Sequence, residues 1–353
     1  MRALIAMSGG VDSSVAALLM QQQGFECIGC TMHLYDNEDA GLPKSHTCCS
    51  ASDVDDARRV AYSLGMDYFV FNFKNDFRHQ IIDKFICSYE HGLTPNPCID
   101  CNRYMKFDKL FDRAQILQCR YVVTGHYARI EHTDGEYFLK KSADETKDQS
   151  YVLYMLSQEQ LAHIAFPLGG LEKSQVREIA REHGFCNAGK PDSQDICFVP
   201  DGDYARIIEM HTGKKPVPGD FVDTDGHVIG HHKGIIRYTI GQRRGLGISA
   251  SEPLYVVSIH PENNTVVVGH DEDLLTYSAN VRDFHWISGH APEKEIKCSA
   301  KIRYRHREQS AVAVPKQDGT VEIVFDTAQR AVTPGQAAVL YDGDVVLGGG
   351  TIF

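Results

Sequence analysis

The sequence predicts an α/β chain in which a parallel-sheet domain is followed by two small β-rich domains. Two observations support this prediction. Up to about residue 200, apolar strand-like runs alternate with helix-like stretches, which is the pattern of parallel α/β units. From about residue 215, turn dipeptides such as Asp225-Gly226 and Asp342-Gly343 separate short β-branched runs. We therefore expect domains at residues 1–205, 206–277 and 278–353.

The elements of the first domain follow from apolar runs and from helical spacing. The expected strands are Leu4–Met7, Glu26–Met32, Tyr68–Phe71 and Tyr121–Thr124. Asp12–Gln23 and Ser52–Leu64 are expected to be helices, because their apolar residues recur at helical spacing and a glycine follows each of them.

Length, composition and charge exclude several classes of protein. The 353 residues exceed one ordinary core, and 42% hydrophobic with 24% charged residues is typical of a folded globular protein. The sequence contains no run of about 18 apolar residues, so we expect no membrane partner, and the short apolar start does not resemble a secretion signal, so we expect a cytoplasmic location. The net charge of 36 − 47 = −11 argues against a protein that coats nucleic acid through a globally basic surface.

A glycine turn follows the first expected strand. Ser8-Gly-Gly-Val-Asp-Ser-Ser14 lies directly before a helix, so free backbone N–H groups and the helix dipole form a seat for an anion. The turn is not a Walker A motif, and it does not have the Gly-x-Gly-x-x-Gly pattern of a dinucleotide site. On its own, a Ser-Gly-Gly turn is equally compatible with a capped tight turn.

Three of the eleven cysteines lie in loop-like surroundings. Cys98 and Cys101 form a Cys-x-x-Cys within Thr94-Pro-Asn-Pro-Cys-Ile-Asp-Cys-Asn102, and Cys197 ends Asp192-Ser-Gln-Asp-Ile-Cys197. Such a Cys-x-x-Cys can be half of a zinc site, a dithiol pair or part of a cluster ligand set. Cys48 and Cys49 form a further adjacent pair, and most other cysteines are expected to be buried small side chains.

A local basic pattern occurs near the C-terminus. Lys301-Ile-Arg-Tyr-Arg-His-Arg307 carries positive charges at period two, which predicts one charged face of a strand. That face either protects a sheet edge or contacts a phosphate backbone.

Taken together, these motifs resemble those of the bacterial tRNA 2-thiouridylases, a family of N-type ATP pyrophosphatases. The resemblance rests on the glycine turn, Thr94-Pro-Asn-Pro with Cys101-Asn102, Thr124-Gly-His-Tyr-Ala128, Lys147-Asp-Gln149 and Asp192 to Cys197. It implies a nucleotide-binding domain of the ATP pyrophosphatase type and a β-barrel as the last domain. It also implies an enzyme that uses ATP, with Mg²⁺, to replace the 2-oxygen of the wobble uridine with sulfur in tRNAs for Lys, Glu and Gln. The implied sulfur donor is a persulfide on a cysteine desulfurase or relay protein.

The resemblance assigns roles to individual positions. It implies ATP contacts at Ala6, Met7, Ser8, Gly9, Gly10, Val11, Asp12, Ser13, Met32 and Gly125. It implies tRNA contacts at Asn96, Pro97, Cys98, His126, Lys147, Asp148, Gln149, Arg303, Tyr304 and Gln336. Cys197 is implied to carry the persulfide and Cys101 to act as the nucleophile, with a Cys101–Cys197 disulfide as one product.

Several alternatives stay open on the sequence. Some relatives carry Asp at the position of Cys98, so Cys98, Cys101 and Cys197 are also a possible ligand set for an iron–sulfur cluster that carries the sulfur. A different ATP pyrophosphatase-type enzyme, such as an amide-forming ligase or a tRNA-lysidine synthetase, shares the glycine turn. A non-catalytic RNA- or metal-binding module remains a third interpretation.

Overall fold

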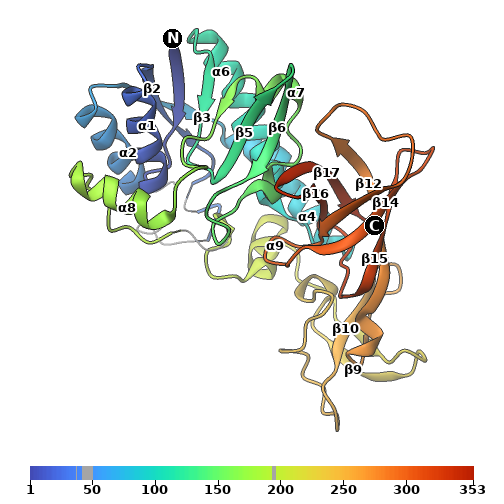
Figure 1. The fold of residues 1–353 in the computed structure, drawn as a ribbon. Coiled ribbons are helices and arrows are strands. Elements are labelled where there is room, and N and C mark those ends of the chain that lie inside the picture. Colours follow the sequence, from blue (N-terminus) through green and yellow to red (C-terminus); the bar gives the residue numbers. More distant parts are fainter. Residues whose placement is uncertain (37, 42–50, 193–195) are drawn as a thin grey trace.

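The computed structural model describes residues 1–36, 38–41, 51–192 and 196–353, and it contains three β-sheets (Figure 1). The blue and cyan N-terminal part surrounds a parallel sheet, and the red C-terminal part forms a barrel on the other side of the molecule. In the part of the chain that is described, no helix combines the length and apolar character needed to cross a membrane.

The N-terminal sheet is entirely parallel, with the strand order β3-β2-β1-β4-β7. Its strands are β1 (Arg2–Ala6), β2 (Glu26–His33), β3 (Asp67–Asn72), β4 (Tyr121–Val123) and β7 (Ile164–Ala165). The two predicted helices are α1 (Val11–Gln22) and α2 (Ala51–Ser63). The predicted parallel α/β fold is therefore confirmed. The four strands and two helices expected from the sequence begin and end within two residues of the observed bounds.

Helices cover both faces of this sheet, because neighbouring side chains of the central strand point to opposite sides. Ile5 packs into a core with α1, α2 and α8 (Lys173–Glu182). Leu4 packs into a second core with the helices on the other face. The second layer contains α3 (Lys74–Phe77), η1 (Arg78–Ile82), α4 (Asp83–Glu90), α5 (Pro97–Asp100), η2 (Cys101–Lys109), α6 (Leu110–Ile116) and α9 (Tyr204–Thr212). η1 and η2 are π-helical.

The middle sheet is small and has its own core. Its order is β10-β11-β8-β9, formed by β8 (Gly219–Val222), β9 (Val228–His232), β10 (Tyr255–His260) and β11 (Thr265–Gly269). Phe221, Val256 and Val266 are fully buried within it. The short helix η4 (Ile235–Arg237) lies between β9 and β10, and η5 (Glu272–Leu274) lies between β11 and the barrel.

The C-terminal strands close into a barrel, as expected. The six strands are β12 (Leu275–Trp286), β13 (Ile296–Lys301), β14 (Gln309–Pro315), β15 (Val321–Arg330), β16 (Ala337–Asp342) and β17 (Val345–Ile352). Pairing of β12 with both β15 and β17 closes the ring. The domain limits near residues 205 and 277 stay a prediction.

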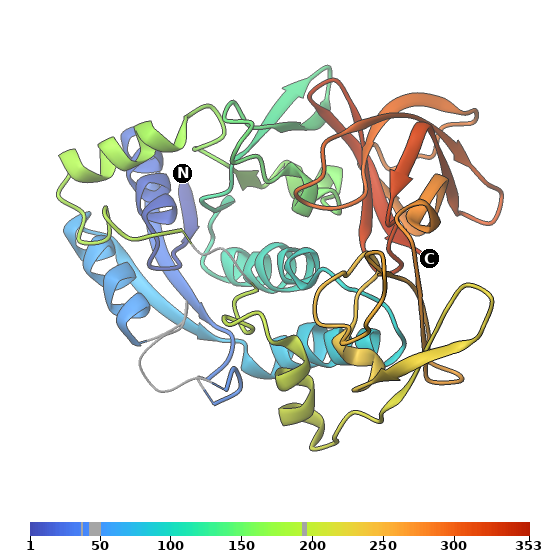
Figure 2. The same ribbon diagram turned by 90° about the horizontal axis from the view of Figure 1, so that it is seen from below.

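One element of the first half of the chain joins the barrel sheet. The hairpin of β5 (Ala128–Thr133) and β6 (Glu136–Lys141) extends that sheet through a bridge between Lys140 and Val345. The short helices η3 (Ser150–Leu153) and α7 (Gln158–Leu161) follow it. Seen from below, the teal helical segment of residues 97–116 lies between the blue sheet and the red barrel (Figure 2).

The structure corrects the expected basic strand. β13 ends at Lys301 and pairs with β14 through Ala300 and Gln309, so residues 302–308 form the connection between two antiparallel strands. The predicted single charged face is therefore wrong. Arg303 turns inward, whereas Arg305 and Arg307 are exposed.

Candidate active site

The glycine turn lies between the carboxyl end of β1 and the amino end of α1. Gly9 has a φ of +76°, and a Cβ there would lie 2.3 Å from the backbone oxygen of Asp53. Only glycine fits both that conformation and that approach. The hydroxyl groups of Ser13 and Ser14 each donate to the Gly10 oxygen over 3.1 Å, which closes the turn over the start of α1. The helix therefore presents its positive end at this edge of the sheet.

The other residues expected around ATP lie at the same edge. A Cβ on Gly125, two residues after β4, would lie 2.8 Å from the backbone nitrogen of Ser13. Met32 is near the carboxyl end of β2, and Ala6 ends β1. Ligands bind at this edge in open parallel sheets. The positions of these residues suit a nucleotide site, and their individual contacts with ATP stay a prediction.

Side chains that the motifs did not indicate hold the turn in place. Lys173 Nζ lies 2.7 Å from both carboxylate oxygens of Asp12. Asn187 donates to the Gly9 oxygen over 3.0 Å and to Ser14 over 2.9 Å, while Lys190 donates to the Gly9 oxygen over 3.2 Å. These residues follow the turn by more than 150 positions, so only the fold brings them together.

Asp192 is a charge centre next to this site. Its carboxylate contacts Lys147 at 2.8 Å, Lys173 at 2.8 Å and Arg177 at 3.1 Å. Burial alone would raise the pKa of Asp192, but hydrogen bonds from Lys147 and Lys173 outweigh it and hold the pKa well below its usual range. The segment that follows, residues 193–195, lies outside the described residues, as does the Cys48-Cys49 pair.

Cys98 and Cys101 lie where α5 passes into η2. The Asn96 side chain accepts a hydrogen bond from the Cys98 N–H over 3.2 Å, and Pro97 occupies the first helical position, so this helix start is well capped. Burial raises the pKa of the Cys101 thiol to about 11. Cys98 is exposed as a residue, although burial of its thiol raises its pKa too.

Cys101 and Cys197 belong to the same region of the structure. Both side chains pack against the buried cluster that contains Leu4, Met105 and Phe198. Tyr35 donates its hydroxyl to the Cys197 oxygen over 2.6 Å, which fixes the backbone at the end of this loop. Two cysteines with 95 residues between them in the sequence thus pack against one core.

A compact group of side chains of the kinds that can ligate a metal ion lies elsewhere in the molecule. Among the described residues, the only three His, Cys, Asp or Glu side chains with ligand atoms all within 4.8 Å of one another are Asp223, Asp225 and His227, on the β8–β9 turn. Cys98, Cys101 and Cys197 do not meet that criterion, so they do not form a compact site for a single ion.

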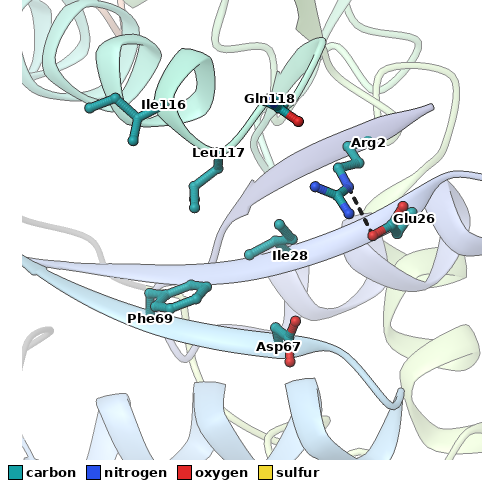
Figure 3. A pocket seen from close by; sticks show the side chains of 8 residues that line it. All are labelled: Arg2, Glu26, Ile28, Asp67, Phe69, Ile116, Leu117 and Gln118. Atoms are coloured by element: carbon teal, nitrogen blue, oxygen red, sulfur yellow. Dashed lines mark hydrogen bonds and ion pairs between the residues drawn. The ribbon is translucent and has the colours of Figure 1, made fainter.

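A separate hollow lies away from the glycine turn (Figure 3). It is bordered by Arg2, Glu26 and Asp67, which begin β1, β2 and β3, and Arg2 Nε donates to Glu26 over 2.9 Å. Because the strands are parallel, their amino ends lie at the opposite edge from the glycine turn. This hollow is therefore not part of the candidate site.

Comparison with known proteins matches the whole architecture. Residues 1–201 match the tRNA methyl transferase HUP domain, residues 205–270 the tRNA methyl transferase PRC-barrel domain, and residues 277–352 the Aminomethyltransferase beta-barrel domain. The tRNA-specific 2-thiouridylase MnmA 1 of Thermoanaerobacter sp. (strain X514) is 51% identical, over 99% of this chain and 97% of its own. The tRNA-specific 2-thiouridylase MnmA of Clostridioides difficile (strain 630) is 50% identical, over 99% and 98%.

The chain belongs to the tRNA-specific 2-thiouridylase family. The family predicted from the motifs is confirmed. Among solved structures, a 4-thiouridine synthetase–RNA complex with bound ATP is similar at 17% identity and a TM-score of 0.39, over 60% of this chain and 51% of that chain.

In this 2-thiouridylase family member, the barrel directly contacts the segment expected to hold the base. Gln336 Nε2 donates to the Thr94 oxygen over 2.8 Å, and the Thr94 N–H donates to the Pro334 oxygen over 2.9 Å. The Tyr304 ring lies 5.9 Å from that of Tyr151 and is partly exposed. Gln336 thus contacts Thr94 and Pro95, the two residues that precede Asn96.

Other residues expected to contact tRNA are engaged within the fold of this thiouridylase. Asp148 accepts hydrogen bonds from the Ser142 N–H over 3.1 Å and from the Ser150 hydroxyl over 2.8 Å. Gln149 accepts from the Tyr127 N–H over 3.0 Å. Arg303 Nη2 donates to the Ala331 oxygen over 2.6 Å. Their contacts with tRNA stay a prediction.

Proposed function

We propose that this chain uses ATP to replace the 2-oxygen of the wobble uridine of tRNA with sulfur. The observation that carries the proposal is one shared core. Ala6 and Met32, at the expected ATP site, and Cys101 and Cys197, the expected sulfur-handling residues, all pack against the same buried cluster. This shared core supports a common location for nucleotide activation and thiol chemistry.

The first proposed step activates the base. The 2-oxygen of uridine attacks the α-phosphorus of ATP and pyrophosphate leaves, so that the base carries AMP on this oxygen. The amino end of α1 supplies the positive potential for the departing pyrophosphate, and Gly9 and Gly10 allow the backbone to approach it. A uridine stacked in the anticodon loop does not expose this oxygen, so we expect the base to leave the stack beside Asn96 and Pro97.

The second proposed step transfers sulfur. The terminal sulfur of a Cys197 persulfide attacks C2 of the activated base. The Cys101 thiolate then attacks Cys197 Sγ, the bond between the two sulfur atoms of the persulfide breaks, and its electron pair forms C2=S as AMP leaves. The resulting Cys101–Cys197 disulfide is reduced by an external dithiol before the next turnover.

The partners follow from this chemistry. We propose tRNAs for Lys, Glu and Gln as substrates, and a persulfide on a cysteine desulfurase or relay protein as the sulfur donor. Exposed Arg305 and Arg307, on the turn that carries Tyr304, supply local positive charge for a phosphate backbone on a chain of net charge −11.

Replacing Cys197 tests the proposal. Cys197→Ser should still release pyrophosphate when tRNA is added, because adenylation does not use the thiol, but it should form no 2-thiouridine. Cys87→Ser is the matched control, since Cys87 is exposed on α4 and is expected to have no role. Normal thiolation by Cys197→Ser would refute the proposed role of this residue.

Sulfur transfer through an iron–sulfur cluster is tested separately. The iron content of anaerobically purified protein should be negligible if Cys197 carries a persulfide. Stoichiometric iron that is lost in Cys98→Ser would instead support the cluster as the sulfur carrier.

A further inference from the structure

Lys106 lies on the same π-helix as Cys101. In a π-helix the backbone bonds join residues five apart, and such segments are frequent at functional sites. Because η2 runs from Cys101 to Lys109, Lys106 follows Cys101 by about one turn of the same π-helix. Met105, which would take that place in an α-helix, is instead fully buried in the neighbouring core.

His126 holds the Lys106 ammonium group. Lys106 Nζ lies 3.3 Å from His126 Nε2, and His126 Nδ1 lies 2.6 Å from the Thr124 hydroxyl. An ammonium group can only donate, so Nε2 accepts and Nδ1 carries the proton. The imidazole is buried and packs against the rings of Phe107 and Phe166, at 5.9 and 5.7 Å between ring centroids, which restricts its orientation.

The charge of this pair resides on the lysine. Burial and the neighbouring Lys106 hold the pKa of His126 well below its usual range, so the ring is neutral at pH 7. The same ammonium affects both cysteines of the Cys-x-x-Cys. Burial raises the pKa of Cys101 to about 11 and also raises the pKa of Cys98, and in both cases the positive charge of Lys106 opposes that rise. Cys98 and Asp100 act on Cys101 in the other direction.

We propose that Lys106 is a positioning residue whose ammonium group, held by His126, stabilises the Cys101 thiolate for its attack on Cys197. The inference rests on the proposed function, in which Cys101 is the nucleophile. In forming the thiolate, Cys101 loses its proton to solvent. The electron pair then forms the bond to Cys197 Sγ, and the bond between Cys197 Sγ and the transferred sulfur breaks. A cation beside a buried thiol is the usual means of making it reactive.

The direct test measures the reactivity of Cys101 in the full chain. Iodoacetamide alkylation of the peptide that contains Cys101 is followed by mass spectrometry at a series of pH values. In Lys106→Gln the profile should move to higher pH, and each pKa unit lowers the thiolate fraction about tenfold. Lys106→Arg should keep the wild-type profile, because it retains the charge. Lys109→Gln is the matched control, since Lys109 ends the same helix and pairs with Asp76 at 2.8 Å.

Two activity measurements separate this inference from the proposed function. Lys106→Gln should keep tRNA-dependent pyrophosphate release and lose 2-thiouridine formation, and raising the pH should restore part of that loss. An unchanged alkylation profile in Lys106→Gln, or a thiolation defect that higher pH does not relieve, would overturn the role of Lys106. Normal thiolation by Cys101→Ser would overturn the proposed nucleophile instead, and the alkylation profile would still report whether Lys106 acts on that thiol.

Discussion

The closest approach in the glycine turn gives a quantitative prediction for Gly9→Ala. A methyl group at this position would lie 2.3 Å from the Asp53 oxygen, where about 3.5 Å is the normal separation, so the turn or the Asp53 backbone must move by roughly 1 Å. Overpacking of this kind costs about 1–3 kcal/mol. The left-handed conformation, at a φ of +76°, adds about 1–2 kcal/mol for a residue with a side chain.

Gly24→Ala separates these two contributions. Gly24 has a φ of +84°, close to that of Gly9, but no atom of the described residues lies within 4 Å of the place its methyl group would take, so it should show the conformational cost alone. In urea unfolding followed by circular dichroism, the free energy of unfolding of Gly9→Ala should therefore be about 1–3 kcal/mol lower than that of Gly24→Ala. Pyrophosphate release should be normal in Gly24→Ala and show a raised KM for ATP in Gly9→Ala. Equal destabilisation with an unchanged KM would refute the steric argument.

Two further predictions concern partly buried charged side chains, Asp192 and Arg303. Because its folded-state pKa is lowered, Asp192 contributes stability above its unfolded-state pKa of about 3.9 and loses it as pH falls toward the folded value. The melting temperature of the wild type should therefore fall below about pH 4. In Asp192→Asn this fall should be smaller, and parallel curves of melting temperature against pH for the two proteins would contradict the prediction. Arg303→Ala leaves the Ala331 oxygen without this donor and should cost about 1–3 kcal/mol of stability. Arg305 is exposed, so Arg305→Ala should leave the free energy of unfolding unchanged and weaken tRNA binding. Equal losses of stability in Arg303→Ala and Arg305→Ala would contradict the inward placement of Arg303.

Elements whose structure depends on neighbouring residues could be predicted from the sequence. The strands of the parallel sheet are short apolar runs, and the ends of α1 and α2 are marked by Gly24 and Gly65, so local pattern and observed bounds agree. The glycine turn was also predictable, because its chemistry lies in consecutive residues. Lys173 and Asn187 were not, since neither has a local pattern and their contacts with Asp12 and Gly9 exist only in the folded chain.

Errors arose where distant residues decide the structure. The hairpin at residues 128–141 was missed, although Asp134-Gly135 between two alternating runs was an available signal. Its membership of the barrel sheet depends on Val345, more than 200 residues away. The turn at residues 302–308 contains no glycine, proline, asparagine or aspartate, so nothing marked it as a break in the period-two pattern.

Contacts between the barrel loop at residues 334–336 and the segment at residues 94–96 give the barrel a structural part in the site, in addition to its expected part in tRNA binding. Gly335, at a φ of +91°, approaches the 94–96 segment so closely that a Cβ would lie 2.8 Å from the Thr94 nitrogen. Hydrogen bonds from Gln336 to Thr94 and from Thr94 to Pro334 join the same two loops. These contacts therefore link the barrel to the loop that continues into Asn96 and Pro97, the residues expected to hold the base. Because Cys98 and Cys101 follow directly on α5 and η2, the same contacts also couple the barrel to the segment that carries the two thiols.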